Sequence, residues 1–143
     1  MTESFKGKTW VTHVPLWPDR LASAWLIVRH IDHDAKVLCV AKNDPIPRSA
    51  LTFCFDGARF SHSAVQLAFE TLQSNFNLSS NLALGKIAIL IRSIEGVGNP
   101  VSEGPGVKAM LDGAKRRSAT ERDLLDESLK TFDLLYEAYR EEK

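Results

Sequence analysis

The sequence has no excess of either charge, because 18 lysine and arginine residues are balanced by 18 aspartate and glutamate residues. Binding to phosphate backbones or anionic lipid generally needs a positive field, so the composition gives no support to a nucleic-acid or membrane-surface role. The chain also lacks the ~20-residue apolar run that crosses a bilayer. Its polar start, residues 1–8, has no apolar core of a secretory signal. We therefore expect a cytoplasmic protein.

Cysteine is scarce as well. Cys39 and Cys54 each lie inside an apolar run, and they form no CxxC pair. This spacing excludes a zinc ribbon and a thioredoxin-type site and predicts small buried thiols in a reducing compartment. Gly96 and Gly98 follow a predicted helix rather than a strand, and the later glycine of a dinucleotide-binding motif is missing. These glycines therefore do not indicate a dinucleotide-binding site.

What the sequence does contain is enough apolar material for a core, since 44% of its 143 residues are hydrophobic. We expect one domain over residues 1–143 of the α+β class, mainly helical, with about five helices and a small sheet of about three short strands. The predicted strands are residues 9–12, 36–41 and 51–55. The predicted helices are residues 19–32, 63–76, 81–95, a fourth from Val107 and a fifth from the Ser118 capping box.

Charges fall on the apolar faces of two of these helices. At about 100° per residue, Arg20 and Asp32 share the inward face of the first helix, and Glu95 takes the next position on the apolar line of the third. Arg20 and Asp32 are about 18 Å apart along the helix and cannot pair with each other. A buried carboxylate needs hydrogen bonds, an arginine or a metal ion. The alternative, that Asp32 and Glu95 reach solvent in a last helical turn, stays open.

The histidines differ in their expected surroundings. His30 and His33 fall on the polar side of the first helix, where we expect them to be solvated. His62 lies between a strand-like segment and the second helix, from which an imidazole can point into a cleft. Glu70 lies off the apolar face of its helix and is expected in solvent unless another helix covers it.

The order of these motifs resembles a known family. WVT at residues 10–12 and DRLASAWLIVRHID at residues 19–32 resemble the opening of the C-terminal domain of the ChrB family of chromate-resistance proteins, which reads roughly WVT, a proline, then DRIACxWLIRRFID. The similarity continues through RFSH at 59–62, FE at 69–70, LIRSIE at 90–95 and TFDLLY at 131–136.

The resemblance covers nearly the whole chain and implies a role in chromate or oxidative-stress resistance. In full-length regulators of this type an N-terminal DNA-binding half precedes the matching domain, so nucleic-acid binding is not expected of this domain alone. Ser23 and Leu67 stand where the family often has cysteine, which argues against thiol chemistry in this chain. Glu95 stands where the family has aspartate and keeps the carboxylate.

We expect a ligand-binding or sensing domain that takes a small ion. Carboxylate and imidazole ligands suit iron, manganese or zinc, and the candidate metal ligands are Asp32, His62, Glu70 and Glu95. A variant binds an oxyanion such as chromate, since guanidinium groups match oxyanions. The candidate residues for that variant are Asp19, Arg20, Arg29 and Arg92.

Two alternatives use the same residues differently. The first is a small metal-dependent enzyme with residues 96–106 as a mobile lid. The second is a scaffold without a ligand, in which Arg20, Asp32 and Glu95 form internal ion pairs and the last helix docks a second copy or a regulatory partner.

Overall fold

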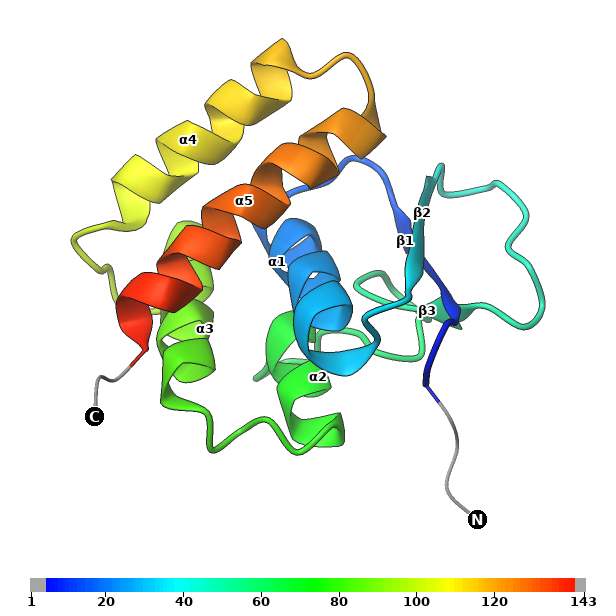
Figure 1. Ribbon diagram of the computed structural model, residues 1–143, viewed down its shortest axis with the longest axis horizontal. Helices are drawn as coiled ribbons and strands as arrows, with labels where there is room; N and C mark the ends of the chain where they lie inside the picture. The colour runs from blue at the N-terminus through cyan, green and yellow to red at the C-terminus, as the bar shows by residue number, and fades with distance from the viewer. Residues whose placement is uncertain (1–4, 141–143) are drawn as a thin grey trace.

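The computed structural model describes residues 5–140 and has the α+β architecture that the sequence predicts (Figure 1). Residues 1–4 of the polar start lie outside the described residues. The strands are β1 (Thr9–His13), β2 (Lys36–Val40) and β3 (Leu51–Thr52). The helices are α1 (Pro18–Leu26), a π-helical turn η1 (Ile27–Ile31), α2 (Ala68–Asn75), α3 (Leu82–Ile94), α4 (Gly104–Arg117) and α5 (Glu121–Tyr139). No helix within residues 5–140 is long and apolar enough to cross a membrane.

The sheet is parallel, with strand order β2-β1-β3. The central strand β1 is buried on both faces, since Trp10, Val11 and Thr12 in succession are 0% exposed. Strand β3 is shorter than predicted, because Cys54 adopts a positive φ of 60° and turns the chain out of the sheet. Phe53 keeps a single parallel bridge to Phe60.

Helix α1 begins with Pro18 in its first turn, where the missing N–H of proline costs nothing. It continues into η1, so the two together span almost the predicted range, and the N–H of Asp32 closes the π turn on the carbonyl of Ile27 at 2.7 Å. The prediction that Arg20 and Asp32 face inward is confirmed, since they are 6% and 2% exposed. His30 was expected in solvent, but it is half-buried and packs edge-on against Trp25.

Helix α2 begins at Ala68, five residues later than predicted. Ser63 does accept the N–H groups of Val65 and Gln66, but these bonds close a turn and not a helix. Leu67, the residue before α2, has no side-chain acceptor for the first N–H groups of the helix. The acceptor comes from another helix, at the site where α1 and α2 meet.

The last three helices match the prediction in number and order and differ in where two of them begin. Asn81 caps α3 by accepting the N–H of Leu84 at 3.1 Å. Helix α4 begins at Gly104, so the end of the predicted loop 96–106 is helical, because Pro105 favours a first helical turn. Helix α5 is capped by Thr120 and not by Ser118, whose hydroxyl donates to the last turn of α4.

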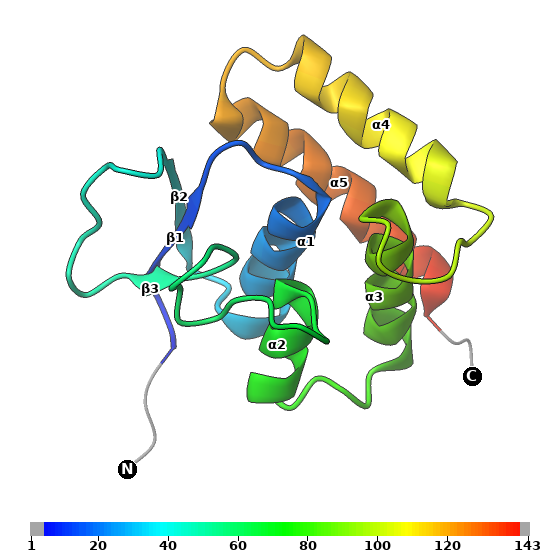
Figure 2. The same ribbon diagram turned by 180° about the vertical axis from the view of Figure 1, so that it is seen from behind.

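Helix α1 lies at the centre of the molecule. It packs against α2 and α3 on one side and under α5, while α4 lies along the outer side of α5 (Figures 1 and 2). The apolar positions of α5 mostly face this core, as predicted: Leu125 and Phe132 are buried and Tyr136 is half-buried. This packing brings the N-terminal end of α1, the C-terminal end of α3 and the chain before α2 to one place.

Candidate functional site

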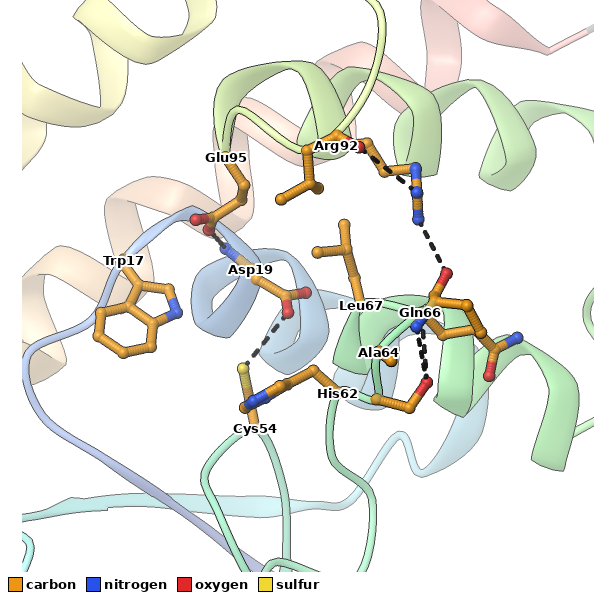
Figure 3. A pocket seen from close by; sticks show the side chains of 12 residues that line it. Trp17, Asp19, Cys54, His62, Ala64, Gln66, Leu67, Arg92 and Glu95 are labelled. Atoms are coloured by element: carbon orange, nitrogen blue, oxygen red, sulfur yellow. Dashed lines mark hydrogen bonds between the residues drawn. The ribbon is translucent and has the colours of Figure 1, made fainter.

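A pocket of about 230 Å³ lies at this meeting point (Figure 3). It is formed by side chains from the start of α1, the end of α3, the turn after β3 and the segment 62–67. The residues that line it are Trp17, Asp19, Cys54, His62, Ser63, Ala64, Val65, Gln66, Leu67, Arg92, Glu95 and Val97.

Asp19 joins α1 to α2 at the base of the pocket. Its carboxylate is 4% exposed and accepts the N–H groups of Ala68 at 3.0 Å and Phe69 at 3.2 Å. It therefore supplies the N-terminal cap that Leu67 cannot, and its negative charge lies at the positive end of the α2 dipole. Burial raises the pKa of Asp19, although the two N–H groups and the Cys54 thiol oppose that change. The carboxylate is thus held as part of the fold and forms part of the pocket wall.

Glu95 is the pocket carboxylate that can still accept further hydrogen bonds. Its Oε2 accepts the backbone N–H of Asp19 at 2.8 Å, and its Oε1 has no hydrogen-bond partner within residues 5–140. Burial raises the pKa of Glu95 and the charge of Asp19 adds to this, while the Asp19 N–H and Arg20 act in the opposite direction. The half-buried side chain reaches the pocket from the end of α3 (Figure 3).

The opposite wall carries a thiol and an imidazole. Cys54 is 2% exposed and donates to Asp19 with an Sγ–Oδ2 distance of 3.5 Å. Burial raises the pKa of Cys54, and the adjacent carboxylate adds to this, so the sulfur remains a neutral thiol at neutral pH. His62 lies at the edge of the pocket, with its Nε2 3.3 Å from Asp56 Oδ1.

Arg92 holds the segment 62–67 against α3. Its Nη1 donates to Glu70 Oε1 at 2.8 Å and to the carbonyl of Val65 at 3.3 Å, and the same Glu70 oxygen accepts the N–H of Leu67. Glu70 is therefore covered by another helix, which is the condition under which we expected it to leave solvent. Glu70 itself lies outside the pocket lining.

The other two arginines predicted for an oxyanion are engaged by other groups of the protein. The guanidinium of Arg20 donates to the carbonyls of His13, Pro15 and Cys54 and lies 3.7 Å from the centre of the Trp17 ring. Backbone carbonyls are thus its partners. Arg29 forms an ion pair with Asp133 of α5 at 3.0 Å. Neither arginine lines the pocket.

Asp32 lies at the far end of the α1–η1 helix from Asp19 and does not line the pocket. Its carboxylate accepts the N–H groups of Gly7 and Lys8 and the indole N–H of Trp10, at 2.7, 2.8 and 3.0 Å. Burial acts to raise the pKa of Asp32, but these hydrogen bonds outweigh it and the pKa is lowered. Asp32 thus anchors the N-terminal segment to the sheet and η1.

Of the four predicted metal ligands, the structure brings His62 and Glu95 to one pocket and places Glu70 behind its wall and Asp32 elsewhere. In the described part of the chain, no group of three or more His, Cys, Asp or Glu side chains is placed to hold a metal ion. Sequence reasoning missed Trp17 and Cys54 as pocket residues, because an aromatic before a helix and a cysteine in an apolar run are ordinary features.

The fold and the pocket define a small α+β domain with an acidic pocket where three helices meet. The chain belongs to the family of ChrB C-terminal domains, whose model matches residues 10–139. It is 39% identical over 132 residues to protein ChrB of Cupriavidus metallidurans, and the alignment covers 92% of this chain and 41% of that relative. The chain thus spans less than half the length of this relative. No solved structure matches it significantly. The resemblance inferred from the motifs is confirmed.

Proposed function

We propose that this domain is a ligand-binding, sensing module in chromate or oxidative-stress resistance, and that its ligand carries positive charge and enters the pocket over Asp19 and Glu95. Membership of the ChrB C-terminal family supports the resistance role. The observation that supports the charge of the ligand is the Glu95 carboxylate. It is half-buried in the pocket, and it forms no ion pair within residues 5–140.

The charges around the pocket favour a cation over an oxyanion. Among the residues that line it, the carboxylates of Asp19 and Glu95 face one guanidinium, that of Arg92, and one imidazole, that of His62. Arg92 is already paired with Glu70 behind the wall, and His62 lies 3.3 Å from Asp56, so the two lining carboxylates leave an excess of negative charge. Chromate would meet this excess charge, and Arg92, the arginine that lines the pocket, already binds Glu70.

A divalent metal is one class of cation that fits the chemistry of the donors. His62 and Glu95, with Asp19 beside them, offer imidazole nitrogen and carboxylate oxygen, which are the donors that iron, manganese and zinc take in proteins. An organic cation is the other class, since an ammonium group can donate to the free Oε1 of Glu95. Either class of cation would compensate the negative charge of Glu95.

Binding measurements on two variants test the proposal. MnCl₂, ZnSO₄, n-pentylammonium chloride and sodium chromate are titrated in turn into the wild-type protein by calorimetry. We expect saturable binding of at least one cation and none of chromate. Glu95→Gln keeps the hydrogen bond from Asp19 but removes the charge, and it should weaken that binding by about tenfold or more.

The matched control is Asp112→Asn, which removes a carboxylate from the exposed surface of α4. It should bind the cation as the wild type does. Absence of binding by every cation, equal loss in both variants, or chromate binding that survives in Glu95→Gln would each overturn the proposal.

A further inference from the structure

The bottom of the pocket is acidic, and an apolar rim surrounds it. Trp17, Val65 and Val97 line the pocket and are nevertheless 43%, 76% and 54% exposed. Leu67 continues this surface inside, between Asp19 and Arg92 in Figure 3. Large exposed apolar side chains gathered round a concave, charged site are typical of a ligand-binding surface.

A metal ion would use only part of this site. It needs several converging donors, and no cluster of three is placed for it in the described part of the chain. Its hydration shell would gain nothing from an apolar rim, which stabilises a ligand only by removing apolar surface from water. The size of the site points the same way. A volume of about 230 Å³ is well above the ~30 Å³ that one water molecule occupies, so a body of several carbon atoms fits.

The base of the pocket suits a donor with several N–H groups. Glu95 Oε1 is free within residues 5–140, and the neighbouring Asp19 carboxylate adds negative charge while already accepting from two N–H groups. A primary ammonium has three donors and a charge concentrated on one atom. It can therefore pair with Glu95 without the fixed geometry that a metal ion requires.

We infer that the pocket binds a small organic cation, with a primary ammonium group at Glu95 and an alkyl or aryl body between Trp17, Val65 and Val97. This inference rests on the proposed function and narrows its cationic ligand to one chemical class. Negative charge at the bottom of the pocket selects the ammonium head group of the ligand. Burial of apolar surface against the rim selects its alkyl or aryl body.

The test is a series of alkyl compounds titrated into the whole domain by NMR or calorimetry. n-Pentylammonium should bind on the order of tenfold tighter than n-propylammonium, because two more methylene groups are buried. n-Pentanol, which has the same body without the charge, should bind at least tenfold more weakly than n-pentylammonium. Glu95→Gln should lose most of the affinity for the ammonium ions.

The contribution of the apolar rim to binding is tested separately from that of the carboxylate at the bottom of the pocket. Val65→Ser with Val97→Ser should reduce the gain from propyl to pentyl and leave n-propylammonium binding nearly unchanged. Both side chains are largely exposed, so the fold should survive. Leu134→Ser, at an apolar residue of α5 that is 69% exposed and outside the pocket, is the matched control and should change neither ligand.

The outcomes distinguish a failure of the inference from a failure of the proposed function. Stoichiometric binding of Mn²⁺ or Zn²⁺ that depends on Glu95, without ammonium binding, overturns this inference and leaves the proposed function standing. n-Pentanol binding as tightly as n-pentylammonium, or no dependence on chain length, also overturns the inference. Absence of binding by every cation overturns both.

Discussion

At the scale of single residues, Asp32 shows how N–H donors can stabilise a buried charge. Three backbone N–H groups, including that of Asp34, and the Trp10 indole donate to its carboxylate. Asp32→Ala would leave these donors partly buried and unpaired, so we expect a loss of about 2–4 kcal/mol in the free energy of unfolding. Urea denaturation measures it. Asp34→Ala, which removes an exposed carboxylate two residues away, is the control and should cost less than about 0.5 kcal/mol.

The same carboxylate predicts a dependence of stability on pH. Because the pKa of Asp32 is lowered in the folded state, its contribution is present above the unfolded value of about 3.9 and is lost as the pH falls through the folded value. The stability difference between wild type and Asp32→Asn should therefore be constant near neutral pH and shrink below about pH 4. A difference that stays constant down to pH 3 would contradict the assigned cause.

Asp19 is a helix cap supplied by a different helix, and its removal should cost more than that of a local cap. Asn81→Ala removes one capping bond from α3 and should cost about 1 kcal/mol. Asp19→Ala orphans two N–H groups in the interior and should cost about 2–4 kcal/mol, even after relief of the burial that raises its pKa. Both values come from urea denaturation. Equal losses would mean that Asp19 is not the cap that fixes the start of α2.

At the scale of elements, the helices could be predicted from apolar spacing, whereas some of their first residues could not. The start of α3 follows from Asn81, a local cap that the sequence displays. The start of α2 depends on Asp19, which is 49 residues away from Ala68 in the sequence, so no local pattern contains it. Strand β3 ends early because of the positive φ of Cys54, and a cysteine gives no signal of such a conformation.

Two exposed glycines show that the effect of a substitution by alanine can depend on backbone conformation even where there is room for the added Cβ. A Cβ at Gly57 or at Gly113 would meet no atom within 4 Å, but Gly57 has a φ of +90° and Gly113 lies inside α4. Gly113→Ala should stabilise the protein by about 0.5–1 kcal/mol, since alanine restricts the unfolded chain and favours a helix. Gly57→Ala should destabilise it by about 1 kcal/mol or more. Thermal unfolding measures both, and effects of the same sign would contradict this explanation.

At the scale of the whole molecule, the site depends on which helix ends meet. The sequence correctly placed Asp32 and Glu95 on inward faces, but it could not show that α3 ends at the beginning of α1. Glu95 therefore contacts Asp19, while Asp32 lies 13 positions further along, or about 20 Å at 1.5 Å per residue. Helical rotation predicts the face on which a side chain lies. The partner it meets there is decided by the packing of α1 against α2, α3 and α5.

Because the site is formed where several helices pack together, we expect ligand binding to stabilise the whole domain. This stabilisation should be stronger at higher pH. A ligand at 100 times its Kd adds about 2.7 kcal/mol to the free energy of unfolding. The ammonium pairs with ionised Glu95, whose pKa is raised in the ligand-free fold by burial and by Asp19. Binding must therefore displace a proton below that pKa, and the affinity should increase as the pH rises through it.

The measurement is the increase in Tm caused by n-pentylammonium chloride, recorded from pH 5 to pH 8 against equal sodium chloride. The increase should grow with pH in the wild type. In Glu95→Gln it should be small and nearly flat. The other charged or titratable groups that line the pocket are Asp19, Cys54, His62 and Arg92, and those directly beside it are Arg20, Asp56 and Glu70. His62→Gln tests the imidazole, which adds positive charge when protonated. A pH dependence that survives in Glu95→Gln and disappears in His62→Gln would assign the titration to the imidazole and contradict the proposed role of Glu95.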